Sequence, residues 1–263
     1  YDEDKFNKLE SIYKKSVFAN TLEKAREAGR MIELNVNYRS VKAVLNAYNI
    51  FYDGRLQNMR EVVKPTKVQF NDFKKYEDKD IFFVEVKNGK EAKEGTSRYN
   101  VEELEATADI LKDLMKTVEN PIGVTVSAIF PYAAQIEKFQ KKYKELINDA
   151  KKHFKSFEID TVDAFQGKES DIVLVNTVVT MEKGNFLSEF RRINVSMSRA
   201  RDKLFIFGNS ITLSKIEMRI NDGNKRTYFR EIIDDIRRFG KMIEYNGGLE
   251  YGSNKSQIKL KQD

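Results

Sequence analysis

The chain has 263 residues, of which 40% are hydrophobic and 11% aromatic, so it can form a large domain with a real core. It has no cysteine and one histidine, His153, which excludes a disulfide framework, a thiol nucleophile and a cysteine zinc site. The net charge of +6 suits nucleic acid or a nucleotide, although a soluble surface of mixed charge has the same balance. No apolar run approaches the roughly 18 residues of a membrane span, which fits a cytoplasmic location.

Apolar, β-branched segments alternate along the chain with segments of helical periodicity. Strands are expected at 31–36, 81–86, 124–129, 157–162, 171–178 and 203–207. Helices are expected from the capping pair Asn100 and Glu103 onward, across 136–146, across 190–200 and across 226–239. The segment 87–99 is expected to be an exposed loop, and the tail from Asn246 to be loosely held.

Strands that are apolar on both faces and alternate with helices predict an α/β fold, with a mostly parallel sheet covered by helices on both sides. Such sheets bind ligands at the carboxyl ends of their strands. Unusual side chains follow or precede the predicted strands, and we expect them to converge on one edge of the sheet. They are Arg39, the loop at Tyr132, Gln166, Glu169 and Arg199.

Each of these residues also has an ordinary structural interpretation. Arg39 could be a helix-start cation, Gly167 could serve a turn with positive φ, and Pro131 is common at the first position of a helix. Arg199 and Arg201 could be surface charges. Taken together, however, two arginines on one edge suit phosphoryl transfer, because a guanidinium can donate bidentate hydrogen bonds to phosphate oxygens.

The sequence contains no phosphate-binding loop. No G-x-x-x-x-G-K-[ST] motif occurs, and no predicted strand ends in the acidic pair that would hold Mg²⁺. No metal-binding residues are therefore expected in this chain. The arginines would form one half of a nucleotide site.

Four segments in this order resemble the motifs of the second RecA-like domain of superfamily 1 helicases. They are LNVNYRS (34–40), IFPYAAQ (129–135), TVDAFQGKESDIVLVNTV (161–178) and FRRINVSMSRARDKLFIFGN (190–209). The branch that contains the nonsense-mediated-decay helicase and the replication nuclease-helicase is the most similar. The resemblance implies a RecA-like fold of the P-loop NTPase type and an ATP-dependent helicase or translocase.

The resemblance also implies roles for individual residues. Arg39 and Arg199 would be arginine fingers that approach the γ-phosphate. Gln166, Gly167 and Glu169 would lie at the nucleotide edge and couple it to the nucleic-acid path, and Tyr38 would pack near the adenine. Pro131, Tyr132 and Thr161 would face the sugar-phosphate backbone. Phe130 stands where the family often has threonine, which removes one phosphate-contacting hydroxyl.

The resemblance further implies a chain in three parts: a leader at 1–30, the second RecA-like domain at 31–240 and a polar tail at 241–263. ATP and Mg²⁺ would be held mainly by an N-terminal RecA-like domain upstream, so this fragment alone is expected to be inactive. Single-stranded DNA or RNA would be the other partner. Only about 30 residues separate Tyr132 from Thr161, which leaves no room for the inserted subdomain of the 3′→5′ branch and favours 5′→3′ movement.

Two other hypotheses are kept. The chain could be a non-catalytic nucleic-acid-binding domain derived from a helicase, which would bind single strands without ATP hydrolysis. It could also be an unrelated α/β domain that binds a small molecule.

Overall fold

The computed structural model describes residues 24, 27–29, 35–60, 68–162, 167–180, 190–219 and 225–251. The chain divides into two compact units, Tyr1–Asn35 and Val36–Asp263. In the first unit, Ala28 N donates to Lys24 O at 3.0 Å, as in a helical turn. The second unit contains the sheet and both hydrophobic clusters.

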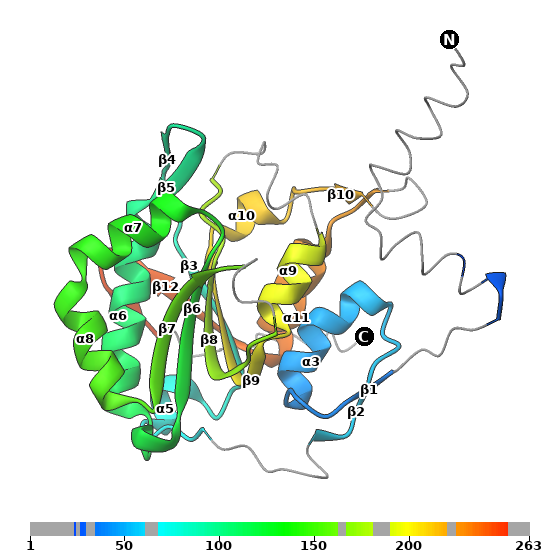
Figure 1. The fold of residues 1–263 in the computed structure, drawn as a ribbon, viewed down its shortest axis with the longest axis horizontal. Coiled ribbons are helices and arrows are strands. Elements are labelled where there is room, and N and C mark those ends of the chain that lie inside the picture. Colours follow the sequence, from blue (N-terminus) through cyan, green and yellow to red (C-terminus); the bar gives the residue numbers. More distant parts are fainter. Residues whose placement is uncertain are drawn as a thin grey trace, which may run out of the picture. The chain divides into compact units, whose positions relative to one another are not determined.

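The second unit is built on a seven-stranded sheet in the order β13-β12-β3-β9-β8-β6-β7 (Figure 1). Its strands are β3 (Ile81–Glu85), β6 (Thr125–Phe130), β7 (Ser156–Thr161), β8 (Ser170–Asn176), β9 (Ala200–Gly208), β12 (Lys241–Tyr245) and β13 (Leu249–Glu250). Every pairing from β12 to β7 is parallel, and only β13 is antiparallel to its neighbour. The predicted mostly parallel α/β sheet is confirmed, and the architecture fits a RecA-like fold.

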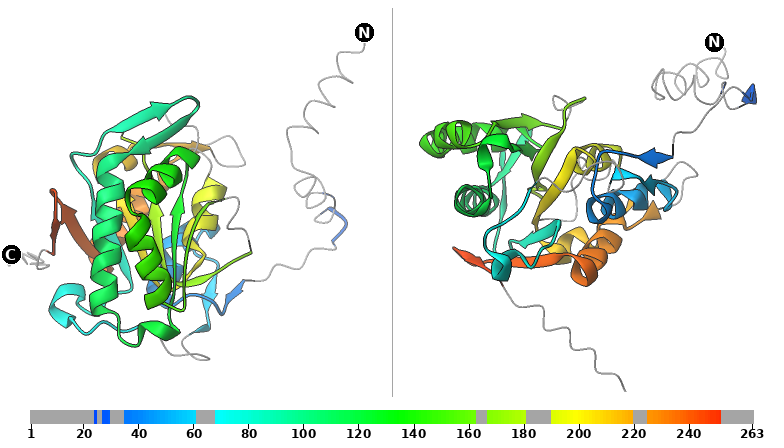
Figure 2. Two further views of the ribbon diagram at one scale, coloured as in Figure 1. Left: turned by 60° about the vertical axis from the view of Figure 1, so that its left-hand side comes forward. Right: turned by 90° about the horizontal axis from the view of Figure 1, so that it is seen from below.

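Helices cover both faces of the sheet because its strands are apolar on both faces (Figure 2). Phe82 belongs to one hydrophobic cluster, and its neighbour Phe83 belongs to the other. One layer contains α3 (Lys42–Asn49), α9 (Phe190–Met197), α10 (Ser210–Leu213) and α11 (Tyr228–Phe239). The other contains α6 (Val101–Thr117), α7 (Ala133–Lys142) and α8 (Lys144–His153).

Several elements differ from the expectation. The helix expected across 136–146 is divided at Tyr143, whose backbone leaves the helical region at φ −117° and ψ 30°. The segment 87–99, expected to be a loop, contains a hairpin of β4 (Glu91–Glu94) and β5 (Ser97–Asn100). The sheet also continues through β12 and β13, within the residues expected to form a tail.

The remaining elements are short. They are β1 (Val36–Asn37), β2 (Gln57–Asn58), β10 (Met218–Arg219), β11 (Lys225–Arg226), α5 (Phe73–Tyr76) and the 3₁₀ turns Ile50–Tyr52 and Pro121–Gly123. Residues 31–34 of the first expected strand lie outside the described residues. Of the helices in the described ranges, none combines the length and apolar character that a bilayer crossing requires.

A buried carboxyl group joins α6 to the end of β8. Asn100 caps α6 by accepting from Glu103 N at 3.2 Å, as the sequence predicts. The Glu103 carboxyl group accepts from Thr177 N at 3.1 Å and from Val178 N at 2.9 Å, where Val178 has a φ of 68°. A β-branched residue rarely adopts that angle, so these hydrogen bonds hold a strained turn in place. Complete burial raises the pKa of Glu103 to about 8.

This raised pKa predicts that Glu103 makes folding less favourable as the pH rises. Above about pH 4.5 the unfolded chain has lost this proton, whereas the folded chain keeps it until about pH 8. Between these pH values, the contribution of Glu103 should lower the free energy of unfolding by up to about 1.4 kcal/mol for each pH unit of increase. Urea unfolding at pH 5, 6.5 and 8 should show wild type losing stability relative to Glu103→Gln. Parallel curves for the two proteins would contradict this role.

Candidate functional site

The predicted site residues lie at two opposite edges of the sheet, and the expectation of a single edge is wrong. Glu169 immediately precedes β8 and Arg199 immediately precedes β9, whereas Tyr132 follows β6 and Thr161 ends β7. Because these strands are parallel, their first residues share one edge and their last residues share the other. We call these the amino edge and the carboxyl edge. The expectation failed because Glu169 and Arg199 lie on segments that enter strands rather than leave them.

At the amino edge, the segment before α3 is fixed to the start of β9. Val41 N donates to Arg201 O at 2.8 Å, and Ser40 Oγ donates to Ala200 O at 2.6 Å. Asn37 Oδ1 accepts from Ser40 N at 3.0 Å and closes the turn. These bonds bring Arg39, which is far from β9 in sequence, to the same place as Arg199.

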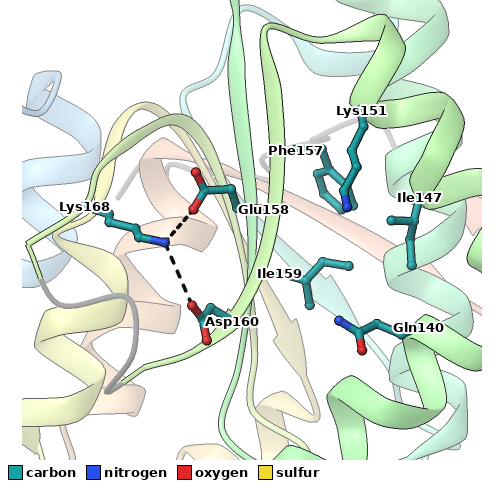
Figure 3. Close-up of a pocket in the computed structure, with 8 residues that line it drawn as sticks. All are labelled: Gln140, Ile147, Lys151, Phe157, Glu158, Ile159, Asp160 and Lys168. Atoms are coloured by element: carbon teal, nitrogen blue, oxygen red, sulfur yellow. Dashed lines mark hydrogen bonds and ion pairs between the residues drawn. The ribbon is translucent and has the colours of Figure 1, made fainter.

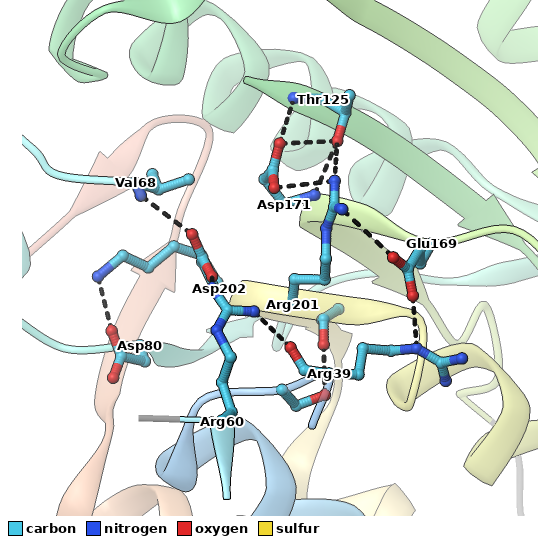
Figure 4. A network of polar contacts seen from close by, with 12 residues as sticks. Arg39, Arg60, Val68, Asp80, Thr125, Glu169, Asp171, Arg201 and Asp202 are labelled. Carbon is cyan, nitrogen blue, oxygen red and sulfur yellow. Dashed lines mark hydrogen bonds and ion pairs between the residues drawn. The ribbon is translucent and has the colours of Figure 1, made fainter. Parts of the chain in front are cut away.

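The Arg39 guanidinium is held on one side and open on the other. Its Nε donates to Glu169 Oε2 at 2.7 Å (Figure 4). Its Nη1 donates to Ser198 O at 3.1 Å. The side chain remains 38% exposed. A charge-assisted hydrogen bond to the Glu169 carboxylate therefore orients Arg39 and leaves part of its guanidinium group exposed to solvent.

Arg199 is a buried cation that lacks a hydrogen-bond partner among the described residues. It is only 9% exposed, and its Nε is buried without a partner there. Burial lowers the pKa of Arg199, the nearby positive charge of Arg39 lowers it further, and Glu169 acts in the opposite direction. Burying a guanidinium without a partner costs free energy, which an incoming anion would relieve.

The amino edge as a whole favours an anionic ligand. Three guanidinium groups, those of Arg39, Arg199 and Arg201, share two carboxylates, those of Glu169 and Asp171. Among the described residues, no cluster of three or more acidic or histidine side chains could hold a metal ion. The arrangement fits the phosphate of a nucleotide and offers no ligand set for Mg²⁺.

The loop before β8 is partly described. Gly167 has a φ of 89°, an angle at which glycine is favoured, and a side chain there would meet no atom within 4 Å. Gln166 lies outside the described residues. Tyr38 is 59% exposed next to Arg39, an uncommon exposure for a large aromatic side chain.

Lys168 pairs with acidic residues of β7 and not with residues of the amino edge. Its Nζ donates to Glu158 Oε2 at 2.8 Å and lies 4.0 Å from Asp160 Oδ2. These residues border a shallow pocket of about 240 Å³ along β7 (Figure 3). The other lining residues are Gln140, Ile147, Lys151, Phe157 and Ile159. The pocket is lined by balanced charges and apolar groups and has no surplus cation for a phosphate.

At the carboxyl edge, the turn after β6 lies beside the end of β7. Phe130 and Thr161 are paired positions of the two strands, and Pro131 and Tyr132 follow Phe130 directly. Burial raises the pKa of Tyr132, Arg98 and Arg192 lower it, and Glu91 raises it. The tyrosine therefore lies near charges of both signs.

Arg98 is a residue that the sequence analysis missed. It belongs to the β4–β5 hairpin, forms an ion pair with Glu91, and lies next to Ser97, whose Oγ accepts from Ala134 N at 3.1 Å. The hairpin is thereby tied to the first turn of α7. Gly95 in its turn has a φ of 59°, and the Gly-Thr pair between two charged segments was the signal available in the sequence.

The chain is similar to a protein named as a helicase and to one named as a regulator of nonsense transcripts. The model of the AAA domain family matches residues 13–211. The chain is 28% identical over 212 residues to "Uncharacterized ATP-dependent helicase MJ0104" from Methanocaldococcus jannaschii, which covers 77% of this chain and 30% of that protein. It is 34% identical over 191 residues to "Putative regulator of nonsense transcripts 1" from Takifugu rubripes, which covers 71% of this chain and 17% of that protein.

The chain therefore spans less than a third of the length of these relatives. Among solved structures, it has a distant likeness to the C-terminal domain of a "possible DNA helicase" from Lactobacillus plantarum, with 10% identity and a TM-score of 0.34 over 66% of this chain and 88% of that one. Because the family model matches more than half of the sequence, this chain belongs to the AAA domain family.

Proposed function

We propose that this chain is the second motor domain of an ATP-dependent helicase or translocase. Its amino edge supplies Arg39 and Arg199 to the γ-phosphate of ATP, which a first RecA-like domain of the same polypeptide holds together with Mg²⁺. Its carboxyl edge grips single-stranded DNA or RNA. By the resemblance of its motifs, movement along the strand is 5′→3′.

The observation that carries this proposal is the buried, unpartnered Arg199 beside the half-open Arg39. Guanidinium groups that are already oriented can stabilise the charge that develops on phosphate oxygens, and such fingers contribute about 10³–10⁵ in rate. A domain that no longer binds a nucleotide would have no reason to keep a buried guanidinium nitrogen without a hydrogen-bond partner. This favours a motor over a non-catalytic binding domain.

The nucleotide must be held mainly by another domain. The sequence has no phosphate-binding loop, and the described residues offer no metal cluster. Bound Mg²⁺ would neutralise phosphate charge, and Arg39 and Arg199 would complete that neutralisation from the opposite side. Glu169 and Gly167 would border the ribose and phosphates with Gln166, and Tyr38 would pack near the adenine.

The carboxyl edge suits a nucleic-acid backbone. Pro131 and Tyr132 follow the strand position paired with Thr161. Arg192 and Arg98, the latter ion-paired with Glu91, lie near the tyrosine. Proteins that hold single strands combine such cations with aromatic side chains on which bases stack. Thr161 lies at this edge and Glu169, eight residues later, lies at the amino edge, so this part of the chain would link nucleic-acid binding to the nucleotide.

The decisive experiment measures ATP hydrolysis by the full-length protein with and without a single-stranded oligonucleotide. We expect turnover that the oligonucleotide stimulates. Salt-dependent binding of the oligonucleotide without ATP turnover would contradict the motor hypothesis and favour the hypothesis of a non-catalytic nucleic-acid-binding domain.

Replacing Tyr132 with alanine should weaken single-strand binding by about 10-fold, or about 1.4 kcal/mol, because an aromatic contact at the carboxyl edge is lost. Fluorescence anisotropy of the full-length protein with a labelled oligonucleotide would measure this. The matched control is Phe73→Ala, which removes another aromatic ring, 69% exposed in α5, and should leave binding unchanged. Equal affinities for wild type and Tyr132→Ala would remove Tyr132 from the interface.

A further inference from the structure

Arg201 differs from Arg199 in that both of its terminal guanidinium nitrogens contact the protein, although its Nε, like that of Arg199, is buried without a partner among the described residues. Its Nη1 donates to Glu169 Oε1 at 3.2 Å, and its Nη2 lies 2.9 Å from Asp171 Oδ1 and 3.2 Å from Thr125 Oγ1 (Figure 4). To reach a phosphate, Arg201 would have to give up these contacts. At the amino edge, Arg201 therefore holds neighbouring side chains in place and does not bind a phosphate itself.

The far end of Arg201 is anchored to two strands of the sheet. Asp171 in β8 is 2% exposed, and its Oδ2 accepts from Thr125 N at 2.8 Å at the start of β6. In return, Thr125 Oγ1 accepts from Asp171 N at 2.9 Å. These reciprocal bonds cross between paired strands, so Asp171 and Thr125 form a rigid base for the guanidinium.

Glu169 connects this base to Arg39. One carboxylate oxygen, Oε1, accepts from Arg201, and the other, Oε2, accepts from Arg39 Nε at 2.7 Å. With Oε1 held by an anchored guanidinium, Oε2 has a fixed direction. The only other contact that the structure gives to the Arg39 guanidinium, among the described residues, is Ser198 O at 3.1 Å.

We propose that Arg201 is a positioning residue that sets the orientation of Arg39 through Glu169, with Asp171 and Thr125 as its base. The inference rests on the proposed function, because it assumes that Arg39 acts on the γ-phosphate. Arg201 itself does not touch the nucleotide. A finger that loses its orientation loses rate, since a misplacement of about 1 Å can cost about 100-fold.

A double-mutant cycle in the full-length helicase tests this. Arg39→Ala should lower the kcat of nucleic-acid-stimulated hydrolysis by about 10³-fold. Arg201→Gln should lower kcat by about 10- to 100-fold, with the KM for ATP changed less than about twofold. If Arg201 acts only through Arg39, the double variant should be no slower than Arg39→Ala, within about twofold.

Two outcomes overturn the inference, and they are distinguishable. If Arg39→Ala has no effect on kcat, the proposed function itself fails and the inference fails with it. If Arg39→Ala collapses turnover but the double variant is a further 10-fold or more slower, Arg201 acts independently of Arg39 and only the inference fails. A purely structural role would give this second, additive result.

Arg201→Gln leaves the buried Asp171 carboxylate without its ion-pair partner and could prevent folding, which thermal melting would reveal. In that case the Asp171→Asn variant is used instead of Arg201→Gln. Its amide oxygen can still accept from Thr125 N, and only the interaction with Arg201 is weakened. Its kcat should fall in the wild-type background and not in the Arg39→Ala background. A fall in both backgrounds overturns the inference. Arg237→Gln, which removes a surface pair with Asp234, is the matched control and should leave kcat unchanged.

Discussion

Arg199→Ala in the full-length protein is expected to lower the kcat of nucleic-acid-stimulated ATP hydrolysis by about 10³-fold or more. The KM for ATP should change by less than about threefold, because the guanidinium acts on charge that develops in the transition state rather than on bound ATP. Arg199→Lys should restore only a small part of the rate, since an ammonium cannot make the bidentate contact. Steady-state kinetics at saturating oligonucleotide would measure both variants.

The same variant separates a role in turnover from a role in stability. Arg199 is buried without a hydrogen-bond partner among the described residues, so its removal should not lower the free energy of unfolding by more than about 1 kcal/mol. Arg237→Ala, at an exposed surface pair, is the matched arginine control and should change neither quantity. A variant that unfolds easily while its kcat stays normal would make Arg199 a structural residue.

Periodicity and apolar runs were sufficient to predict the central sheet. The segments at 81–86, 124–129, 157–162, 171–178 and 203–207 became β3, β6, β7, β8 and β9 within about two residues at most ends. The apolar character of the segments that became β3, β6, β8 and β9 reflects burial on both faces of a covered parallel sheet, whereas β7 lies at the end of the sheet and is largely half-buried. The capping pair Asn100 and Glu103 likewise predicted the start of α6.

The edge that each motif occupies could have been predicted from the order of the elements. Glu169 and Arg199 precede the strands expected at 171–178 and 203–207, which places them at the amino edge of a parallel sheet. The hairpin at Gly95 and the strand β12 were missed for a different reason. β4 carries charged residues, and β12 begins with Lys241, whose burial depends on an ion pair with the distant Glu77.

The polar network under Arg39 is the least predictable part of the site, because its bonds join residues far apart in the chain. Arg60 Nη1 donates to Arg39 O at 2.5 Å, and its Nη2 donates to Asp202 Oδ1 at 2.5 Å (Figure 4). Asp202 Oδ2 also accepts from Val68 N at 3.1 Å. Nothing in the local sequence of Arg60 distinguishes it from a surface arginine.

Arg60→Ala should therefore cost this chain about 3–5 kcal/mol of unfolding free energy, measured by urea denaturation at neutral pH. The Arg60 side chain is 6% exposed and that of Asp202 is fully buried, so the substitution leaves a buried carboxylate without its ion-pair partner. The matched control is Arg226→Ala, whose bidentate pair with Glu231 lies on the surface and should be worth about 1 kcal/mol or less.

The double variant Arg60→Ala, Asp202→Asn shows why Arg60→Ala loses stability. If the loss comes from removing the cation that pairs with the Asp202 carboxylate, the neutral amide should recover part of the unfolding free energy, because it can still accept from Val68 N. If the double variant is as unstable as Arg60→Ala, the cost lies elsewhere, in the lost packing of the arginine and its bond to Arg39 O. In both cases Arg60 donates to the backbone of Arg39, so the position of Arg39 and the stability of its edge of the sheet depend on the same buried arginine.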